Sequence, residues 1–306
     1  MAVLEDPLID NNPILQSYYA SFESRVGYYL FLGGTRHFGY YASGTYWPFP
    51  INGALRKMED RLFAALELRP GAKVLDAGCG AGHVAVHLAR KGLRICAIDV
   101  VSHHVQSAKE EIRRNGLENM ASARVMDYHH LESLADESFD GVYTMETIVH
   151  ATNPEKVLGN FFRVLKPGGR IAMHEYDHLD SSHSQNSPPA VIRSMQEVNK
   201  RTSMPGYEMF SRGVLPSMLE EQGFEDVILD DLTENVRPMA RLFFIVAYIP
   251  YLIICFFGLQ AYFANTQAGV EVYRYLKAGL CRYTVVTATK PSNSTSKRRR
   301  AVSKDL

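Results

Sequence analysis

The sequence of 306 residues predicts an α/β fold, in which helices cover both faces of a mostly parallel sheet of seven strands. Three observations predict this fold. Short apolar segments typical of strands alternate with segments of helical spacing between residues 73 and 173. Acids or glycines follow several of these apolar segments, as expected where the carboxyl ends of parallel strands form a site. An aromatic segment precedes this core and a long apolar run follows it.

A glycine-rich turn follows the first predicted strand, residues 73–75, and precedes residues 84–89, which have helical spacing. The turn contains one acid and three glycines: Asp76, Gly78, Gly80 and Gly82. Glycine adopts positive φ angles without strain and lets a ligand lie against bare backbone. The turn therefore predicts a ligand site between the strand and the helix.

The next strand indicates which kind of ligand binds there. Residues 93–98 predict a strand that ends at Asp99, and an acid at this place is suited to the two hydroxyls of a ribose. A dinucleotide turn would need its third glycine at position 83, where this chain has His83. Asp76 beside the turn would also repel a pyrophosphate, whereas it suits a ligand that carries an ammonium and a sulfonium. These residues favour a nucleoside cofactor with positive charge and count against a dehydrogenase.

The turn resembles motif I of the class I S-adenosylmethionine-dependent methyltransferases, which have a Rossmann-like fold. Further segments match in the family's order: a strand over residues 123–128, a strand over 139–146, a helix over 157–165 that ends at 166–169, and a strand over 170–173. In the family, the acid at the place of Asp127 binds the adenine amine and the neighbouring side chain lies on the ring. The resemblance implies S-adenosylmethionine as cofactor and assigns these residues to it: Asp76, Gly78, Gly80, Gly82, Asp99, Val100, Asp127, Tyr128 and Met145.

The loop after the fourth strand resembles that of the sterol C-methyltransferases, where Glu-Ala-Thr-x-His-Ala follows this strand. Glu146, His150 and Ala151 match that pattern by position, and Glu175 matches the acid in the family's Tyr-Glu-Trp. Tocopherol-type and alkaloid N-methyltransferases share much of this framework. An alkene acceptor becomes a carbocation, which carboxylates and aromatic faces stabilise and from which a base removes a proton. The candidate catalytic residues are therefore Glu146, His150 and Glu175, although each histidine is equally well explained as a hydrogen-bonded loop residue.

The segment from Tyr18 to Phe49 is crowded with aromatic residues and glycines. Such a cluster predicts the wall of a pocket for an apolar ligand, and the alternative is that the rings pack this segment onto the sheet. Phe38-Gly39-Tyr40-Tyr41 loosely resembles the sterol family's Tyr-Glu-Tyr-Gly-Trp but lacks its acid, which leaves the substrate open. The predicted substrate-binding residues are Tyr40, Tyr41, Tyr46, Trp47 and Tyr176.

Composition narrows the functional class. The chain has 33 basic and 33 acidic residues, so charge gives no reason to expect a nucleic-acid partner. Its four cysteines form no CxxC pair, which argues against a zinc site and a disulfide framework, and we expect no metal. The first residues lack the basic and apolar regions of a signal peptide, so we expect a cytoplasmic, reducing compartment.

Beyond the core, the sequence predicts a loop over residues 181–189 and helices over 191–200 and 217–224. Strands are expected over 227–230 and 281–289, the last of which inserts into the sheet in the related family. The expected divisions are an aromatic lid segment (1–55), the cofactor-binding core (56–180), a substrate cap (181–290) and a disordered basic tail (291–306) that includes Lys297-Arg298-Arg299-Arg300.

Residues 242–259 form an uncharged apolar run of 18 residues that contains Pro250. A membrane span needs about 20 apolar residues, and an internal proline kinks a helix. We expect a cap helix or helical hairpin that lies in a membrane interface, which would let an apolar substrate pass from lipid into the pocket. The alternatives are a fully buried cap helix and a true span, and a span would keep the last strand out of the sheet.

The resulting expectation is a methyltransferase that acts on a lipophilic small molecule, sterol-like or terpenoid-like, at a membrane such as the endoplasmic reticulum. The first alternative is an N- or O-methyltransferase of an alkaloid or another small metabolite. The second, which is not an enzyme, is a membrane-anchored scaffold subunit with the methyltransferase fold. A homo-oligomer is compatible with each of these.

Overall fold

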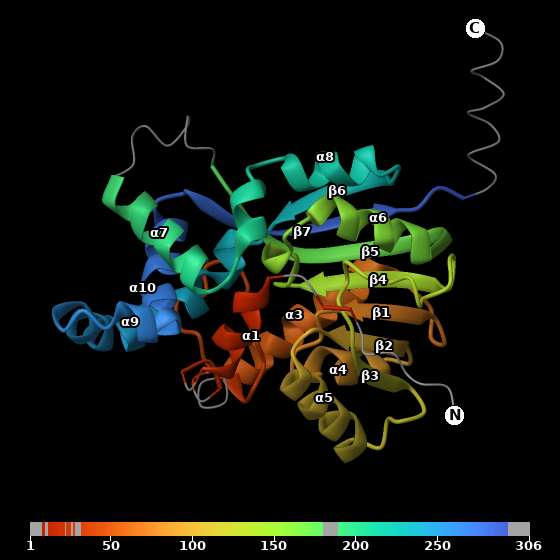
Figure 1. Cartoon of the computed structure of the whole chain (residues 1–306), viewed down its shortest axis with the longest axis horizontal. Helices are drawn as coiled ribbons and strands as arrows, with labels where there is room; N and C mark the ends of the chain where they lie inside the picture. Colours follow the sequence, from red (N-terminus) through yellow and green to blue (C-terminus); the bar gives the residue numbers. More distant parts are fainter. Residues whose placement is uncertain are drawn as a thin grey trace, which may run out of the picture.

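A computed structural model describes residues 8–9, 12–21, 23–25, 27, 32–179 and 189–292 of the chain. The basic tail at residues 297–300, most of the predicted loop 181–189 and part of the aromatic segment lie outside these residues. Within them, a sheet with helices on both faces is joined to a helical cap, which lies at the carboxyl ends of the strands (Figure 1).

The sheet has seven strands in the order β3-β2-β1-β4-β5-β7-β6, which confirms the predicted fold class. β7 is antiparallel to both of its neighbours, and the pairs from β3 to β5 are parallel. The strands are β1 (Lys73–Ala77), β2 (Arg94–Asp99), β3 (Ala121–Val125), β4 (Phe139–Met145), β5 (Leu165–His178), β6 (Glu225–Asp231) and β7 (Cys281–Thr289).

Most strands differ from the predicted bounds by a few residues, and two of these differences matter for the site and the sheet. β3 ends at Val125, so that Asp127 and Tyr128 follow the strand instead of belonging to it. β5 begins at Leu165 and runs through residues 166–169, which were expected to separate a helix from a strand. The pairing of β4 with β5 shifts register between Phe139 and Gly141, and such an irregularity lets the strand pass through this segment.

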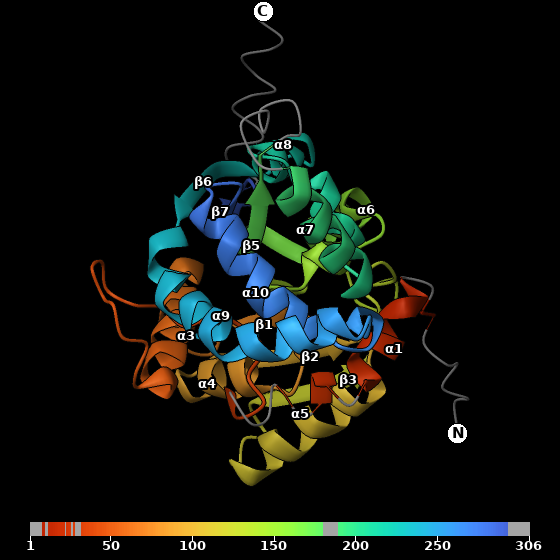
Figure 2. The same ribbon diagram turned by 90° about the vertical axis from the view of Figure 1, so that its left-hand side faces the viewer.

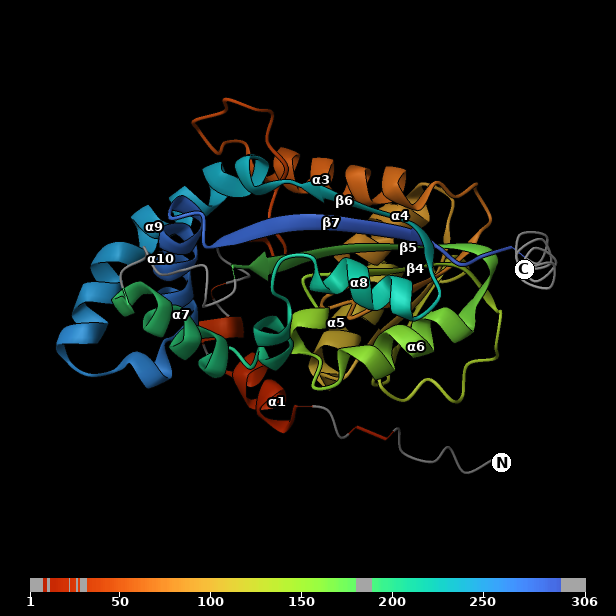
Figure 3. The ribbon, with the colours of Figure 1, turned by 90° about the horizontal axis from the view of Figure 1, so that it is seen from above.

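The helices cover both faces of the sheet, with α3 and α4 on one face and α6 and α8 on the other (Figure 3). The helices of the core are α3 (Ile51–Leu66), α4 (His83–Arg90), α5 (Ser102–Arg114), α6 (Pro154–Val164) and α8 (Val214–Glu221). Because both faces are covered, strand residues such as Leu75, Val142 and Ile171 are fully buried. α3 contributes Leu55, Met58, Leu62 and Leu66 to this core at helical spacing.

The cap consists of α1 (Pro13–Ala20), α7 (Pro189–Arg201), α9 (Thr233–Phe256) and α10 (Ala264–Lys277), with short 3₁₀ turns at Ile148–His150, Pro205–Met209 and Gln260–Tyr262. α9 lies across the cap beside α10, which also packs against α7 (Figure 2). α9 continues through both Pro238 and Pro250.

α9 includes most of the apolar run and is long and apolar enough to cross a bilayer, judged by length and composition alone. Only 17% of its apolar window is buried, which contradicts the alternative of a fully buried cap helix. The strand before α9 and the strand after α10 pair with each other in the sheet. A true span that carried everything after residue 259 across the bilayer is therefore incompatible with this fold, because β7 returns to the sheet as predicted.

Candidate active site

The turn between β1 and α4 has backbone that favours glycine. Gly78, Gly80 and Gly82 have φ angles of 107°, 51° and 83°. A Cβ on Gly78 would lie 2.5 Å from Cγ2 of Thr147, and a Cβ on Gly82 would lie 2.8 Å from the Cβ of Ala108. Gly78 and Gly80 line a pocket at this turn, whereas Gly82 packs against α5 and does not line it.

Asp76 gives this pocket a buried acid. Its Oδ2 atom has no hydrogen-bond partner among the described residues. Burial, together with the negative charge of Asp99, raises the pKa of Asp76 to about 7 against the opposing effect of the Tyr143 hydroxyl. A ligand's ammonium group would supply the missing partner and favour the ionised carboxylate, so this site fits S-adenosylmethionine.

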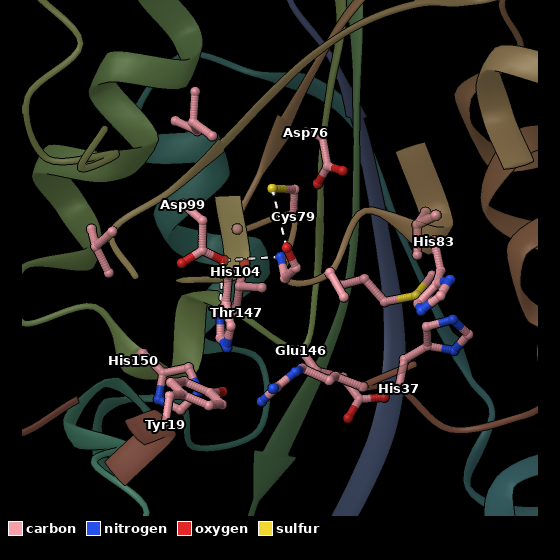
Figure 4. A pocket seen from close by; sticks show the side chains of 18 of the residues that line it. Tyr19, His37, Asp76, Cys79, His83, Asp99, His104, Glu146, Thr147 and His150 are labelled. Carbon is pink, nitrogen blue, oxygen red and sulfur yellow. Dashed lines mark hydrogen bonds and ion pairs between the residues drawn. The ribbon is translucent and has the colours of Figure 1, made fainter. Parts of the chain in front are cut away.

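Asp99 ends β2 on the same side of the pocket as Asp76 and Cys79 (Figure 4). Its carboxylate accepts hydrogen bonds from the backbone N–H of Gly80 at 2.9 Å and of Val101 at 2.8 Å. Burial alone would raise its pKa, but His104, 3.3 Å away, and these N–H groups outweigh burial and lower it. Asp99 is thus ionised, holds the glycine turn and remains a candidate for the ribose hydroxyls.

The wall expected to contact adenine is formed by Val100, Met126 and Tyr128. Asp127 does not line the pocket, because its carboxylate accepts from the backbone N–H of His129 at 2.9 Å and lies 2.8 Å from Nδ1 of that residue. The predicted bond between Asp127 and an adenine amine therefore stays a prediction. The Tyr128 side chain is buried in the wall, consistent with a ring that covers a base.

Met145 and Glu146 lie at the end of β4 in the pocket wall. The Glu146 carboxylate is buried and accepts three hydrogen bonds: from the backbone N–H of Phe38 at 2.8 Å, from the Tyr283 hydroxyl at 2.9 Å and from the Tyr176 hydroxyl. Burial raises its pKa. Glu146 thereby joins three distant parts of the chain and holds residues 33–38, which we call the strap, over the pocket.

His150 faces the pocket from the 3₁₀ turn at Ile148–His150 and lies next to Tyr19 (Figure 4). Its Nδ1 atom is 2.8 Å from the carbonyl oxygen of Ser203, and its Nε2 atom is 3.0 Å from the Tyr19 hydroxyl. A carbonyl only accepts, so Nδ1 carries the proton and Nε2 accepts from Tyr19. Burial lowers the pKa of His150 to about 4, which keeps the ring neutral at pH 7.

Glu175, in contrast, lines neither the cofactor pocket nor the larger cavity that adjoins it. Its Oε1 atom accepts from the backbone N–H groups of Thr147 at 3.1 Å and Ile148 at 3.2 Å. Burial raises its pKa to about 8. Its contacts therefore hold the turn that carries His150, and they do not place it beside a substrate.

A second, larger cavity of about 470 Å³ adjoins the cofactor pocket. This volume is within the range of small-molecule sites. Its walls come from the strap, α1, α7, α9 and α10, and they include Tyr176. The two cavities share five wall residues, which define their junction: Tyr19, Arg36, His37, Glu146 and His150.

The structure places the four other predicted substrate-binding residues away from both cavities. Tyr40 lies under the guanidinium of Arg61, and the Tyr41 hydroxyl donates to the backbone carbonyl of Pro48. Tyr46 and Trp47 are 62% and 71% exposed. Rings of the same aromatic segment that do line the larger cavity are Tyr18, Tyr19 and Phe38.

Arg36 and His37 were not singled out by the sequence, since they belong to no motif and follow an unremarkable pair of glycines. The strap brings them to the junction. The Phe38 N–H is held by Glu146, and the His37 ring lies 3.4 Å from the buried carboxylate of Glu59 on α3. Their position at the junction follows only from the packing of elements that are far apart in the sequence.

Comparisons with known proteins agree with this geometry. Residues 68–235 match the model of the methyltransferase domain family. The chain is 39% identical over 278 residues to the S-adenosyl-L-methionine-dependent Diels-Alderase iccD of Talaromyces variabilis, covering 90% of this chain and 94% of that one. It is 41% identical over 222 residues to the Diels-Alderase iliD of Neonectria sp. (strain DH2), covering 72% and 86%. Sterol C-methyltransferases are among the further relatives.

Solved structures show the same fold. The 4+2 cyclase SpnF superposes with a TM-score of 0.71 at 22% identity, over 94% of this chain and 98% of that one. Related structures with this fold contain S-adenosylmethionine or S-adenosylhomocysteine. The glycine turn, the unpaired oxygen of Asp76 and the family match together identify the cofactor as S-adenosylmethionine, and the chain belongs to the methyltransferase domain family.

Proposed function

We propose that this protein binds S-adenosylmethionine and catalyses an intramolecular 4+2 cycloaddition, the Diels–Alder reaction, of an apolar polyene. Its similarity to two proteins named Diels-Alderases, one of them over 90% of the chain, supports this reaction. The adjoining cavity of about 470 Å³, with a largely apolar wall, supports a substrate of that kind.

The observation that carries the proposal is the hydrogen bonding and position of the three predicted catalytic residues. C-methylation of an alkene needs a base that takes a proton from the resulting cation. Glu146 already accepts three hydrogen bonds, His150 lies between Ser203 and Tyr19, and Glu175 is outside both cavities. A cycloaddition needs no such base, so the bonding of these groups favours it over C-methylation.

In a Diels–Alder reaction, four π electrons of a diene and two of an alkene form two carbon–carbon σ bonds and one new π bond. No atom is gained or lost. The protein's part is to fold the chain so that the two reacting segments are in contact, which removes an entropic barrier. A rigid apolar wall from α9, α10 and the strap suits this task. Bound S-adenosylmethionine supplies a sulfonium cation, which can polarise a conjugated carbonyl electrostatically.

The test uses a synthetic trienone that cyclises slowly in buffer, with the protein loaded with methyl-labelled S-adenosylmethionine, with S-adenosylhomocysteine or without either. We expect the cofactor-loaded protein to accelerate cyclisation and enrich one diastereomer, with a product isomeric to the substrate and free of label. Val272→Phe, which narrows the larger cavity alone, should abolish this acceleration but keep cofactor affinity. A rate equal to that in buffer, or label in the product, would contradict the proposal.

Methyl transfer to a lipophilic acceptor is the second candidate. It is favoured by the further relatives, which include sterol C-methyltransferases and an O-methyltransferase. The junction opens the cofactor pocket to the apolar cavity, as this reaction also requires. Incubation of the labelled cofactor with a lipid and metabolite extract tests it, because a labelled product would identify the acceptor.

We further propose that the enzyme works on the cytoplasmic side of a membrane, with α9 in the lipid interface. α9 exposes a row of large apolar side chains, and the same helix lines the larger cavity through Phe243, Ala247 and Pro250. Tyr46 and Trp47, whose types are enriched at membrane interfaces, are exposed beside it, where Arg241 of α9 lies over the Tyr46 ring at 3.9 Å. An apolar substrate would then reach the cavity from lipid.

A further inference from the structure

The wall of the larger cavity is mostly shielded from solvent, except at one turn of α9. Of the described residues that line this cavity, only Val246 and Pro250 are exposed, and we call these two residues the rim. Val246 is 44% exposed, whereas the wall residues Met195 and Ala240 are 4% and 1% exposed. A side chain that lines a cavity and is also exposed marks the place where the cavity opens to the surface.

Beside the rim, α9 is in close contact with its neighbours. The centroid of the Phe243 ring lies 5.7 Å from that of Phe38 in the strap. On the side of α10, a Cβ on Gly269 would lie 3.3 Å from the Cβ of Ala247, so the two helices touch there. These four residues also line the cavity, and their contacts close its wall next to the opening.

The backbone at the rim lacks one hydrogen bond of a regular helix. Pro250 lies inside α9 and has no N–H group, so the carbonyl of Val246, one turn earlier, has no donor at the usual helical position. The proline ring also crowds that carbonyl. This turn of α9 therefore costs less to displace than a regular turn, at the point where the cavity opens.

The surface outside the rim is apolar. Ile249 follows Val246 by three residues and Ile253 follows Pro250 by three, so each shares a helix face with a rim residue. The two isoleucines are 62% and 53% exposed and do not line the cavity. An apolar path thus runs from the exposed face of α9, over the rim, to the wall of the cavity.

We propose that the rim is the portal of the larger cavity, through which an apolar ligand passes directly from lipid. The proposal rests on the proposed function for the polyene and for the membrane, but passage through the portal can be measured without turnover. Because a portal is a path and not a binding site, narrowing it should slow entry and exit equally and leave the affinity unchanged.

The test follows 1,6-diphenylhexatriene, a polyene hydrocarbon that fluoresces in apolar surroundings and hardly in water. Stopped flow measures its transfer from cyclodextrin, without any membrane, to the protein loaded with S-adenosylhomocysteine. Val246→Trp should slow association and dissociation about three- to tenfold, with a Kd changed less than about twofold. Val246→Ala should accelerate both rates. Ile249→Trp is the matched control, because it places the same ring on α9 outside the cavity, and should change neither rate.

Three results would overturn the portal. The first is that Val246→Trp has the rates of the wild type. The second is a change in the dissociation rate alone, because Val246 would then contact the bound ligand and not lie on its path. The third is equal slowing by Ile249→Trp or by Val246→Ala, which would mean a general disturbance of α9. A wild type that does not bind the hydrocarbon would contradict an apolar ligand altogether.

The lipid route is tested with phosphatidylcholine vesicles as the donor of the probe. Transfer at the membrane surface has a rate that rises with vesicle concentration, whereas transfer through water does not. We expect this rise for the wild type and its loss when Ile249→Glu is combined with Ile253→Glu. A wild-type rate independent of vesicle concentration would overturn the lipid route and the membrane placement together. If the portal variants behave as expected but the trienone is not cyclised, the portal stands and the proposed cycloaddition fails.

Discussion

At the scale of single residues, the buried acids of this site differ because their neighbours differ. Asp99 has the His104 ring and two backbone N–H groups beside it, and these contacts lower its pKa. One oxygen of Asp76 has no hydrogen-bond partner in the part of the chain that the structure describes, and burial raises the pKa of Asp76 to about 7. Near pH 7, Asp99 is therefore ionised before the cofactor binds, whereas Asp76 is only partly ionised until a cation binds beside it.

The raised pKa of Asp76 makes cofactor binding depend on pH. Because the ammonium of the cofactor favours the ionised carboxyl, affinity for S-adenosylhomocysteine should rise from about pH 6 to about pH 8. Calorimetry across this range measures the effect, and Asp76→Asn should bind weakly with little of this dependence. His150, with its pKa of about 4, does not titrate in this interval. A flat profile for the wild type would contradict the role of Asp76.

The stability of the ligand-free chain should show the opposite trend. Asp76 and Glu175 hold a proton more tightly when folded, with pKa values raised to about 7 and about 8. The folded state thus binds more protons than the unfolded state above the ordinary carboxyl pKa. The free energy of unfolding contributed by these two groups should fall as the pH rises from about 4 to about 8, which urea unfolding at several pH values measures.

Substitutions of Glu146 separate a positioning role from a catalytic one. Glu146→Ala leaves the donors of Phe38, Tyr176 and Tyr283 without their acceptor and should reduce stability by about 2–4 kcal/mol. Glu146→Gln keeps an acceptor oxygen for Phe38 and Tyr283, so it should be milder and retain most of the cyclisation rate. Urea unfolding and the trienone assay measure the two effects. A fully folded but inactive Glu146→Gln would instead identify a base.

At the scale of elements, the glycine turn has its shape because β4, α5 and their loops pack against it. Gly78 is confined by Thr147, whose hydroxyl also donates to the carbonyl of Ala77 at 2.8 Å. The turn thus depends on the loop that carries Glu146 and His150. The glycine turn and the loop that carries Glu146 and His150 therefore form one structural unit.

Gly78→Ala tests this coupling. The new Cβ would lie 2.5 Å from Thr147 at a φ of 107°, so we expect destabilisation of about 2–4 kcal/mol and loss of cofactor affinity. Gly116→Ala is the matched control, since it also has a positive φ, 64°, but meets no atom within 4 Å. Urea unfolding should show only a small loss for the control. Equal losses would mean that backbone strain alone, and not Thr147, makes Gly78 necessary.

At the scale of the whole molecule, α9 presents two different surfaces. α9 lines the larger cavity with one side and exposes apolar residues on the other. Since β6 and β7 hold both ends of the α9–α10 pair in the sheet, the pair is suited to lie along an interface and not to cross it.

Vesicle binding tests this placement. Ile249→Glu combined with Ile253→Glu puts two charges on side chains that are 62% and 53% exposed, and should reduce flotation with phosphatidylcholine vesicles at least tenfold. Ile228→Glu, at a 55% exposed residue of β6, should bind as the wild type does. Undiminished flotation of the double variant, or no flotation of the wild type, would count against an interfacial α9.

The parallel core, the glycine turn and the cofactor were all predictable from the sequence. The core and the turn follow from local rules: strand and helix periodicity, the need for glycine at positive φ, and acids at strand ends. The cofactor follows from the resemblance of these segments to the methyltransferase family. The last strand was also predictable, because its run of β-branched and aromatic residues is a local feature.

The contacts of the individual site residues could be seen only in the folded chain. Glu146 holds three hydrogen-bond donors, Glu175 lines neither cavity, and Tyr46 and Trp47 lie on the surface. The junction residues Arg36 and His37 belong to no sequence motif. Their roles depend on contacts between segments more than a hundred residues apart, such as Phe38 with Glu146, and a local pattern holds no information about such contacts.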